Sequence, residues 1–118
     1  MVETIRRLGE TPRLSMAVAH GDRVYLSGQV AIDARGQGVR AQAEEALARI
    51  DALLAEAGTG RDRLLSVTLL LADIAHLPEV NAVWDRWLPA GAAPARTTMQ
   101  TVLASPDYAL EIVAVAAL

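Results

Sequence analysis

The feature that most constrains this chain is its last ten residues, 109–118 (ALEIVAVAAL), which are apolar at almost every position. A strand with one face in water alternates apolar and polar residues, whereas a strand covered on both sides does not. We therefore predict a strand here that is covered on both faces. Its only charged residue is Glu111. Burying a carboxylate in such a strand costs free energy unless it forms an ion pair, accepts hydrogen bonds or contacts water in a cavity.

A second strand is predicted just before it, over residues 94–102 (PARTTMQTV). β-branched residues recur in this run, and Pro94 excludes a helix interior at its start. The run carries one charged residue, Arg96. If residues 104–108 form a hairpin turn, Arg96 and Glu111 lie about five residues out of register, roughly 15 Å along the sheet. Either the register is not that of a simple hairpin, or the two side chains meet across a subunit boundary.

The rest of the chain alternates between strand-like and helix-like patterns. Strands are predicted over residues 4–8, 14–19, 23–30 and 64–71, and helices over 41–57 and 78–88. Apolar residues recur at helical spacing in the first helix, Gly58 ends it, and its charged residues, among them Glu45 and Arg49, are expected in solvent. The order βββαβαββ predicts an α+β fold, a single domain of residues 1–118 with a mixed sheet, two helices packed on one face and hairpins at both ends. Its other face would be uncovered in a monomer, so we expect further copies of the chain to cover it.

Composition excludes several classes of protein. The net charge of −3 argues against a surface for nucleic acid or an anionic membrane. The sequence has no cysteine, which excludes disulfides, thiolate metal sites and a cysteine nucleophile. His20 and His76 have no carboxylate or histidine at ligand spacing, so no metal site is expected. No run approaches the roughly 18 apolar residues of a membrane span, and no signal peptide is visible, so a soluble, cytoplasmic protein is expected.

Some individual residues have an ordinary structural interpretation as well as a functional one. Gly28, inside a predicted strand, indicates either a bulge or a close approach to the backbone. Most arginines on strands serve in salt bridges, which is the structural alternative for Arg96. Asn81 can cap or bridge near the start of its helix. Trp84 and Trp87 fit core or interface anchors better than ligand-stacking residues.

Taken together and in order, several short segments resemble the Rid family (RidA/YjgF) of reactive-intermediate enamine/imine deaminases, from about residue 14 to the end. They are VYLSGQ at 24–29, AG at 57–58, LAD at 71–73, VN at 80–81, PAR at 94–96 and LEI at 110–112. The resemblance implies a chorismate-mutase-like fold assembled as a homotrimer with three clefts between subunits. It also implies hydrolysis of 2-imino and enamine acids to 2-oxo acids and ammonia, with no metal or cofactor. An imine carbon is already electrophilic, so the reaction needs only positioning and a water molecule.

The resemblance assigns roles to individual residues. Arg96 would bind the substrate carboxylate, and Glu111 would orient the attacking water. Ser27 and Gly28 would line the cleft with their backbone, and Asn81 would be a cleft asparagine.

Two positions depart from the family pattern. The residue two after the arginine is often cysteine and here is Thr98, which shares a strand face with Arg96 and can hydrogen-bond a ligand. A usual aromatic residue is absent from the segment that here reads Leu14-Ser15-Met16. These departures keep a second function open, a non-catalytic trimer that binds or senses small carboxylates. A third, a ribonuclease, is disfavoured by the acidic charge of the chain.

Overall fold

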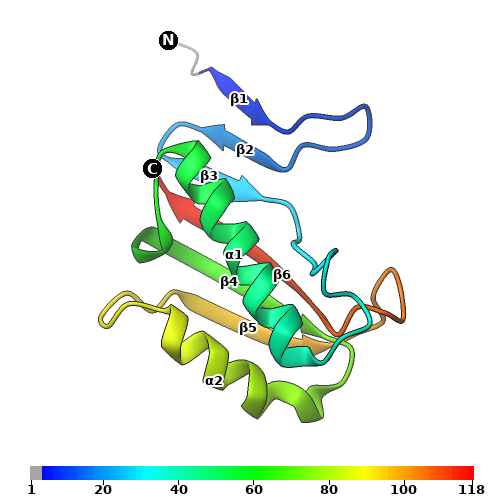
Figure 1. Ribbon diagram of the computed structural model, residues 1–118. Helices are drawn as coiled ribbons and strands as arrows, with labels where there is room; N and C mark the ends of the chain where they lie inside the picture. Colours follow the sequence, from blue (N-terminus) through cyan, green and yellow to red (C-terminus); the bar gives the residue numbers. More distant parts are fainter. Residues whose placement is uncertain (1–3) are drawn as a thin grey trace.

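The structure is a computed structural model that describes residues 4–118, and its elements follow the order predicted from the sequence (Figure 1). The strands and helices are β1 (Ile5–Leu8), β2 (Ala17–His20), β3 (Arg23–Leu26), α1 (Val39–Ala57), β4 (Leu64–Leu71), α2 (Leu77–Trp87), β5 (Ala95–Gln100) and β6 (Leu110–Ala117). Short 3-10 turns, Arg61–Arg63 and Ile74–His76, precede β4 and α2. The predicted βββαβαββ order, with its α+β mixed sheet, is confirmed.

The six strands form one mixed sheet in the order β1-β2-β3-β6-β4-β5. Strands β4 and β5 are parallel, and every other neighbouring pair is antiparallel. The hairpin predicted near the N-terminus is present as β2–β3, whose turn contains Gly21 at a φ of 63°. The hairpin predicted at the C-terminal end is wrong, because β4 lies between β5 and β6. The crossover through α2 returns the chain parallel to β4 on its free edge, so β6 pairs with the other edge of β4.

Both helices lie on the same face of the sheet (Figure 1). On that face, every second residue of β6 is buried: Leu110, Ile112, Ala114 and Ala116. Helix α1 buries a stripe that includes Ala43, Ala46, Leu47, Ile50 and Leu54. As predicted, α1 ends at Gly58, whose φ of 94° is left-handed and whose N–H donates to the carbonyl oxygens of Leu54 and Ala55.

One buried residue of α1 was not foreseen. Gln42 is 1% exposed, and its side chain joins three segments. Its Nε2 donates to the carbonyl oxygens of Gln37 and Asp107 at 2.8 and 3.0 Å, and its Oε1 accepts from the N–H of Ala109 at 2.8 Å. Because every polar atom of the amide is paired, burial costs little, and the loop before β6 is tied to the start of α1.

The opposite face of the sheet carries apolar side chains that are only partly covered. Strand register places Tyr25 beside Val115, and Met99 and Glu111 on either side of Leu70. Tyr25 and Met99 are 47% and 45% exposed. Apolar residues gathered on one open face are typical of a surface that another chain covers. We name this the open face.

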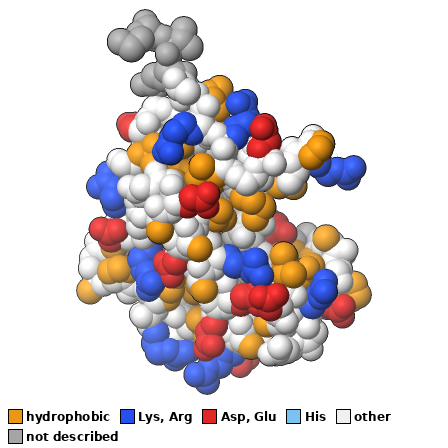
Figure 2. Space-filling model, turned by 45° about the horizontal axis from the view of Figure 1, so that its top comes forward, with side chains coloured by type: hydrophobic (Ala, Val, Ile, Leu, Met, Phe, Trp, Pro, Cys, Tyr) orange, Lys and Arg blue, Asp and Glu red, His pale blue; other side chains and the backbone are white. Residues whose placement is uncertain are grey.

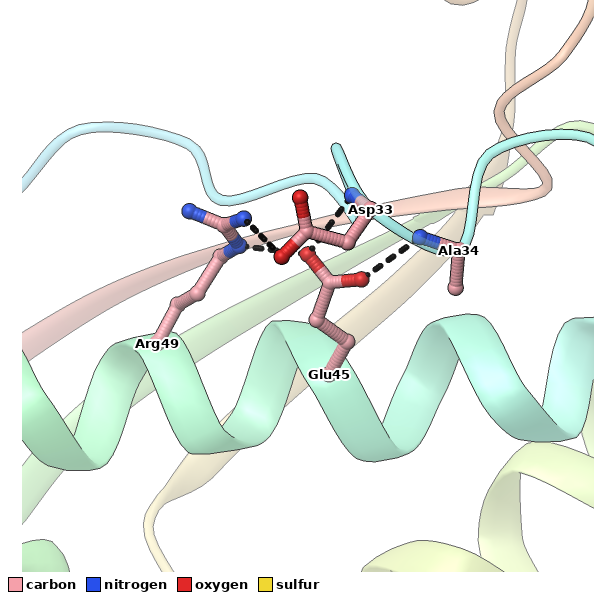
Figure 3. A network of polar contacts seen from close by, with 4 residues as sticks. All are labelled: Asp33, Ala34, Glu45 and Arg49. Atoms are coloured by element: carbon pink, nitrogen blue, oxygen red, sulfur yellow. Dashed lines mark hydrogen bonds and ion pairs between the residues drawn. The ribbon is translucent and has the colours of Figure 1, made fainter.

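Two charged residues of α1 hold a loop rather than standing free in solvent, which corrects the prediction. The Glu45 carboxylate accepts from the N–H groups of Asp33 and Ala34 at 3.2 and 2.7 Å (Figure 3). Arg49 Nε donates to Glu45 at 2.6 Å, and its Nη2 lies 3.5 Å from Asp33 Oδ2. Burial raises the pKa of Glu45, but the hydrogen bonds from Arg49 and the two backbone N–H groups outweigh it and leave the pKa below its ordinary value of 4.5.

We expect Glu45→Gln to destabilise the protein near neutral pH, and we expect this loss of stability to become smaller as the pH falls below 4.5. A lowered pKa in the folded state means that the ionised carboxylate adds stability above its ordinary pKa, near 4.5, and that this stability is lost as the pH falls through the lowered value. The measurement is the free energy of unfolding in urea at pH 7 and pH 3. Glu44→Gln is the matched control, because Glu44 pairs with Arg40 alone among residues 4–118, on the exposed helix surface. Equal stability of Glu45→Gln and the parent protein at pH 7 would contradict the assignment.

Candidate functional site

Arg96 lies at the start of β5 and points toward the helices. It is in register with Val67, which is buried beneath them. Its Nη2 donates to Asn81 Oδ1 on α2 at 2.9 Å, and its Cζ lies 5.3 Å from the centre of the Trp84 ring. The side chain is nevertheless exposed, and among residues 4–118 no carboxylate lies within salt-bridge distance of it. The structure therefore presents a cation that is held in place but not neutralised.

Thr98 is on the same side of β5. It pairs with Leu69, which is fully buried beneath the helices, and is itself half-buried. Arg96, Thr98 and Asn81 thus share the helix side of the sheet at its β5 edge. We name these three residues, with Trp84, the arginine cluster.

A second cluster surrounds Glu111 and is built by the segment that follows β3. Gln29 pairs with Ile112 through two backbone hydrogen bonds, from Gln29 N to Ile112 O at 2.8 Å and from Ile112 N to Gln29 O at 3.0 Å. This pairing brings Gly28 against the Glu111 side chain, because a Cβ atom at Gly28 would lie 2.6 Å from Glu111 Cδ. The glycine therefore marks a close approach, one of the two alternatives that the sequence left open.

Ser27 belongs to the same cluster, and a buried glutamine orients it. Gln29 is 2% exposed, and its Nε2 donates to the carbonyl oxygen of Ser27 at 3.0 Å and to Ser27 Oγ at 3.2 Å. Because Ser27 Oγ accepts from Gln29, its own hydrogen must point elsewhere. Ser27 Oγ donates to Met16 Sδ at 3.9 Å, and a thioether is only a weak acceptor. We name Ser27, Gly28, Gln29 and Glu111 the glutamate cluster.

Within one chain the two clusters are apart, because Arg96 and Glu111 lie on opposite faces of the sheet. Arg96 is level with Ala114 of β6, and both face the helices. Glu111 is an odd number of residues from Ala114, so it faces the opposite way, on the open face. Their positions are also separated by three residues and two strand spacings, roughly 14 Å in the plane of the sheet. The simple hairpin register is excluded, and these two side chains can meet only if they come from different copies of the chain.

Three surface hollows of the single chain lie away from both clusters. One, of about 290 Å³, lies between α1 and α2 and is lined by Glu44, Leu47, Arg61, Val83, Arg86 and Trp87. Two others, of about 290 and 310 Å³, flank the loop before β6 around Pro106 and Tyr108. None of these three includes Arg96, Ser27 or Glu111, so none of them joins the clusters.

Residues 4–118 contain neither a metal-binding cluster of side chains nor a membrane-spanning helix. In this part of the chain, no three histidine, aspartate or glutamate side chains lie close enough together to hold a metal ion. None of its helices has the length and apolar character needed to cross a bilayer.

Sequence reasoning missed Trp84 and Gln29 as neighbours of the predicted site residues. Trp84 follows Asn81 by three positions on α2, so both side chains lie on one side of that helix. That spacing could have predicted Trp84 as a neighbour of Asn81 in the site. Gln29 had none, because its burial depends on pairing with Ile112, which is far away in the sequence.

Known proteins of one family resemble almost the whole length of this chain, in sequence and in fold. The family model described as Endoribonuclease L-PSP matches residues 4–118. The RutC family protein YoaB of Escherichia coli is 37% identical over 115 residues, covering 97% of this chain and 98% of YoaB. The human 2-iminobutanoate/2-iminopropanoate deaminase is 31% identical over 121 residues, covering 98% of this chain and 88% of the human protein. The crystal structure of NMB1025, a YjgF family member from Neisseria meningitidis, superposes with a TM-score of 0.93 at 38% identity, covering 97% of this chain and 94% of NMB1025.

Proposed function

This chain belongs to the Rid/YjgF family, the proteins that the endoribonuclease L-PSP model matches, and on that premise we propose that it is a deaminase that hydrolyses 2-imino and enamine acids. The observation that carries the proposal is the uncompensated charge of Arg96. Its guanidinium is exposed, yet Asn81 and Trp84 hold it in place. Such a group suits the carboxylate of a small acid, because its planar fork can bind both oxygens at once.

The chemistry follows from what the carboxylate contact fixes. In a 2-imino acid the C=N carbon is bonded directly to the carboxylate carbon. Binding of the carboxylate by Arg96 therefore also positions the reacting carbon. Glu111 accepts a hydrogen bond from a water molecule and directs its oxygen at that carbon. Addition of water gives a carbinolamine, which loses ammonia to leave the 2-oxo acid. The sequence contains no lysine and no cysteine, so no lysine amine or cysteine thiol forms a covalent intermediate, and water attacks directly.

We further propose that the site forms between copies of the chain, in a homotrimer. One copy supplies the arginine cluster and the next supplies the glutamate cluster, since Arg96 and Glu111 of one copy face opposite ways. Two different patches that bind each other form a head-to-tail interface, and such an interface closes into a ring when the rotation allows it. A ring of three, with three clefts, is what the family resemblance implies. The apolar open face, with Tyr25 and Met99, would be covered in the ring.

Ser27 has a defined role in this arrangement. The Ser27 hydroxyl accepts from Gln29 Nε2 and donates to the weakly accepting Met16 Sδ, so a stronger acceptor in the cleft would replace the thioether contact. The Ser27 hydroxyl would donate to the substrate or to the water. Because Gly28 has no side chain, the substrate could approach the backbone closely there.

The alternative function is a trimer that binds small carboxylates without hydrolysing them. It is favoured by Thr98, where many relatives have cysteine, and by Met16 beside Ser27 in the segment that lacks the usual aromatic residue. A role in binding RNA has less support. The net charge is −3, and on the face seen in Figure 2 arginine side chains are interspersed with acidic ones rather than gathered in a stripe.

The test of the proposed function is a direct assay. 2-Iminopropanoate is generated in situ from alanine by an amino-acid oxidase, and its disappearance is followed with and without the protein. Faster conversion to pyruvate and ammonia supports the deaminase. Binding of pyruvate without any acceleration, on several imino acids, would favour the carboxylate-binding alternative.

Gly28→Ala is expected to lower kcat by about 10²-fold, the usual cost of a misplacement of about 1 Å at a reacting group. The added methyl would push the Glu111 carboxylate aside, since the Gly28 Cβ position lies 2.6 Å from Glu111 Cδ. Gly28 is not among the glycines with positive φ, so alanine meets no backbone strain there. The measurement is kcat, with the melting temperature recorded beside it.

A double-mutant cycle supplies the control. In a Glu111→Ala background, alanine at position 28 has no carboxylate to displace, so it should change the residual activity less than twofold. An equal loss of activity from Gly28→Ala in both backgrounds would show that the effect does not pass through Glu111.

A further inference from the structure

We propose that Trp84 is a positioning residue for carboxylate binding, an inference that rests on the proposed function of Arg96. Trp84 is 6% exposed, and its ring lies beneath the Arg96 guanidinium with 5.3 Å from Cζ to the ring centre. An arginine over an indole face is attracted by the negative charge of that face, and tryptophan provides the strongest such contact. Trp84 thus fixes where an otherwise exposed side chain places its charge.

Trp84 and Asn81 restrict the guanidinium in different ways. The Trp84 ring covers one face of the group, and Asn81 Oδ1 accepts one Nη2 hydrogen at 2.9 Å. Of the five N–H hydrogens of an arginine, this leaves four for a ligand. The entropy of ordering the side chain is therefore lost on folding rather than on binding, which raises affinity for the carboxylate.

A second arginine–tryptophan pair, between the 3-10 turn that begins at Arg61 and helix α2, is an example of a purely structural contact. Arg61 lies over Trp87 at 5.0 Å, but its Nη2 donates to Asp51 at 2.8 Å and its Nη1 to the Trp87 carbonyl oxygen at 2.9 Å. Trp87 Nε1 donates to the same Asp51 oxygen at 2.9 Å. This cation is neutralised within the protein and has no charge to offer a ligand. Arg96 has the same ring contact and no acidic partner among residues 4–118.

The experiment compares substitutions at the two tryptophans. The variants are Trp84→Phe, Trp84→Leu, Trp87→Phe and Trp87→Leu. For each, we would measure the Kd of pyruvate by calorimetry, KM and kcat for 2-iminopropanoate, and the melting temperature. Trp84→Leu is expected to raise both Kd and KM about 3- to 10-fold with kcat within twofold, and Trp84→Phe about twofold, in the order of cation–π strength. Both leucine variants should melt lower, while Trp87→Leu, whose ring lies 5.6 Å from that of Trp84, should change Kd and KM much less than Trp84→Leu does.

The outcomes separate this inference from the proposed function. If the parent protein binds no pyruvate and hydrolyses no imino acid, the proposed function fails. If it binds pyruvate and Trp84→Leu binds it equally well, the positioning role alone is overturned. An equal rise in Kd for Trp87→Leu would also overturn it, because the effect would then be a general loosening of α2. Should Trp84→Leu not fold, Trp84→Phe and Asn81→Ala decide the question, and unchanged Kd values in both would refute it.

Discussion

Arg96→Ala should reduce kcat/KM for 2-iminopropanoate by about 10²- to 10⁴-fold, because it removes two charge-assisted hydrogen bonds worth about 1.5–3 kcal/mol each. The loss should be general among imino acids, since all carry the carboxylate. The melting temperature should change little: Arg96 is exposed, and its protein contacts are one hydrogen bond to Asn81 and the Trp84 ring.

Two further arginine variants test the reason for this loss. Arg96→Lys keeps the charge but not the planar fork, so its activity should lie between the parent and alanine proteins. Arg86→Ala is the matched control, because Arg86 is an exposed arginine on α2 outside the arginine cluster. Its kcat/KM should stay within twofold of the parent. Undiminished activity in Arg96→Ala would end the role assigned to Arg96, and a parallel loss in Arg86→Ala would show that only overall charge matters.

Mixing two inactive variants should restore activity. Arg96→Ala keeps an intact glutamate cluster, and Glu111→Gln keeps an intact arginine cluster. If each site takes Arg96 from one copy and Glu111 from the next, random assembly of equal amounts leaves about a quarter of the sites with both intact groups. Co-expression of differently tagged variants and purification through both tags removes the unmixed oligomers, so that one site in three is intact in every mixed trimer. Assay of 2-iminopropanoate hydrolysis would measure this fraction.

The mixing experiment has its own control. The double variant Arg96→Ala/Glu111→Gln, mixed with Arg96→Ala, contains no intact Arg96 and should stay inactive. Light scattering on the parent protein tests the trimer separately. If mixed oligomers form and recover nothing, the site does not combine these two residues from different copies.

The helices and strands were predicted from short-range patterns in the sequence. The prediction was accurate where an apolar run or spacing has a clear end signal. Strand β4 was predicted over 64–71 and is observed as Leu64–Leu71. Helix α1 ends at Gly58 as predicted, and it begins at Val39, two residues before the predicted start. Strand β3 is shorter than its predicted range of 23–30 and ends at Leu26. Beyond it, Gly28 lies against the Glu111 side chain, and Gln29 pairs with Ile112 of β6 as an isolated bridge.

The candidate site was predicted only in its residue types. Family resemblance selected Arg96 and Glu111, and their chemistry explains why an arginine and a carboxylate suit an imino acid. Asn81 beside Arg96 and Gly28 beside Glu111 were also among the predicted residues, but Trp84 and Gln29 were not. The stack on Trp84 and the Gln29 contact to Ser27 depend on which elements pack together, and periodicity within one segment carries no such information.

By itself, then, the sequence determined the kinds and order of the elements, because backbone propensity and apolar spacing act over a few residues. Only the tertiary structure decided that β4 lies between β5 and β6, and so that Arg96 and Glu111 face opposite ways. Strand order is set by long-range pairing, here by the crossover through α2 that returns β5 parallel to β4 on its free edge. The same pairing turned Arg96 toward Asn81 and Trp84 and left Glu111 on the open face, where a second copy of the chain can reach it.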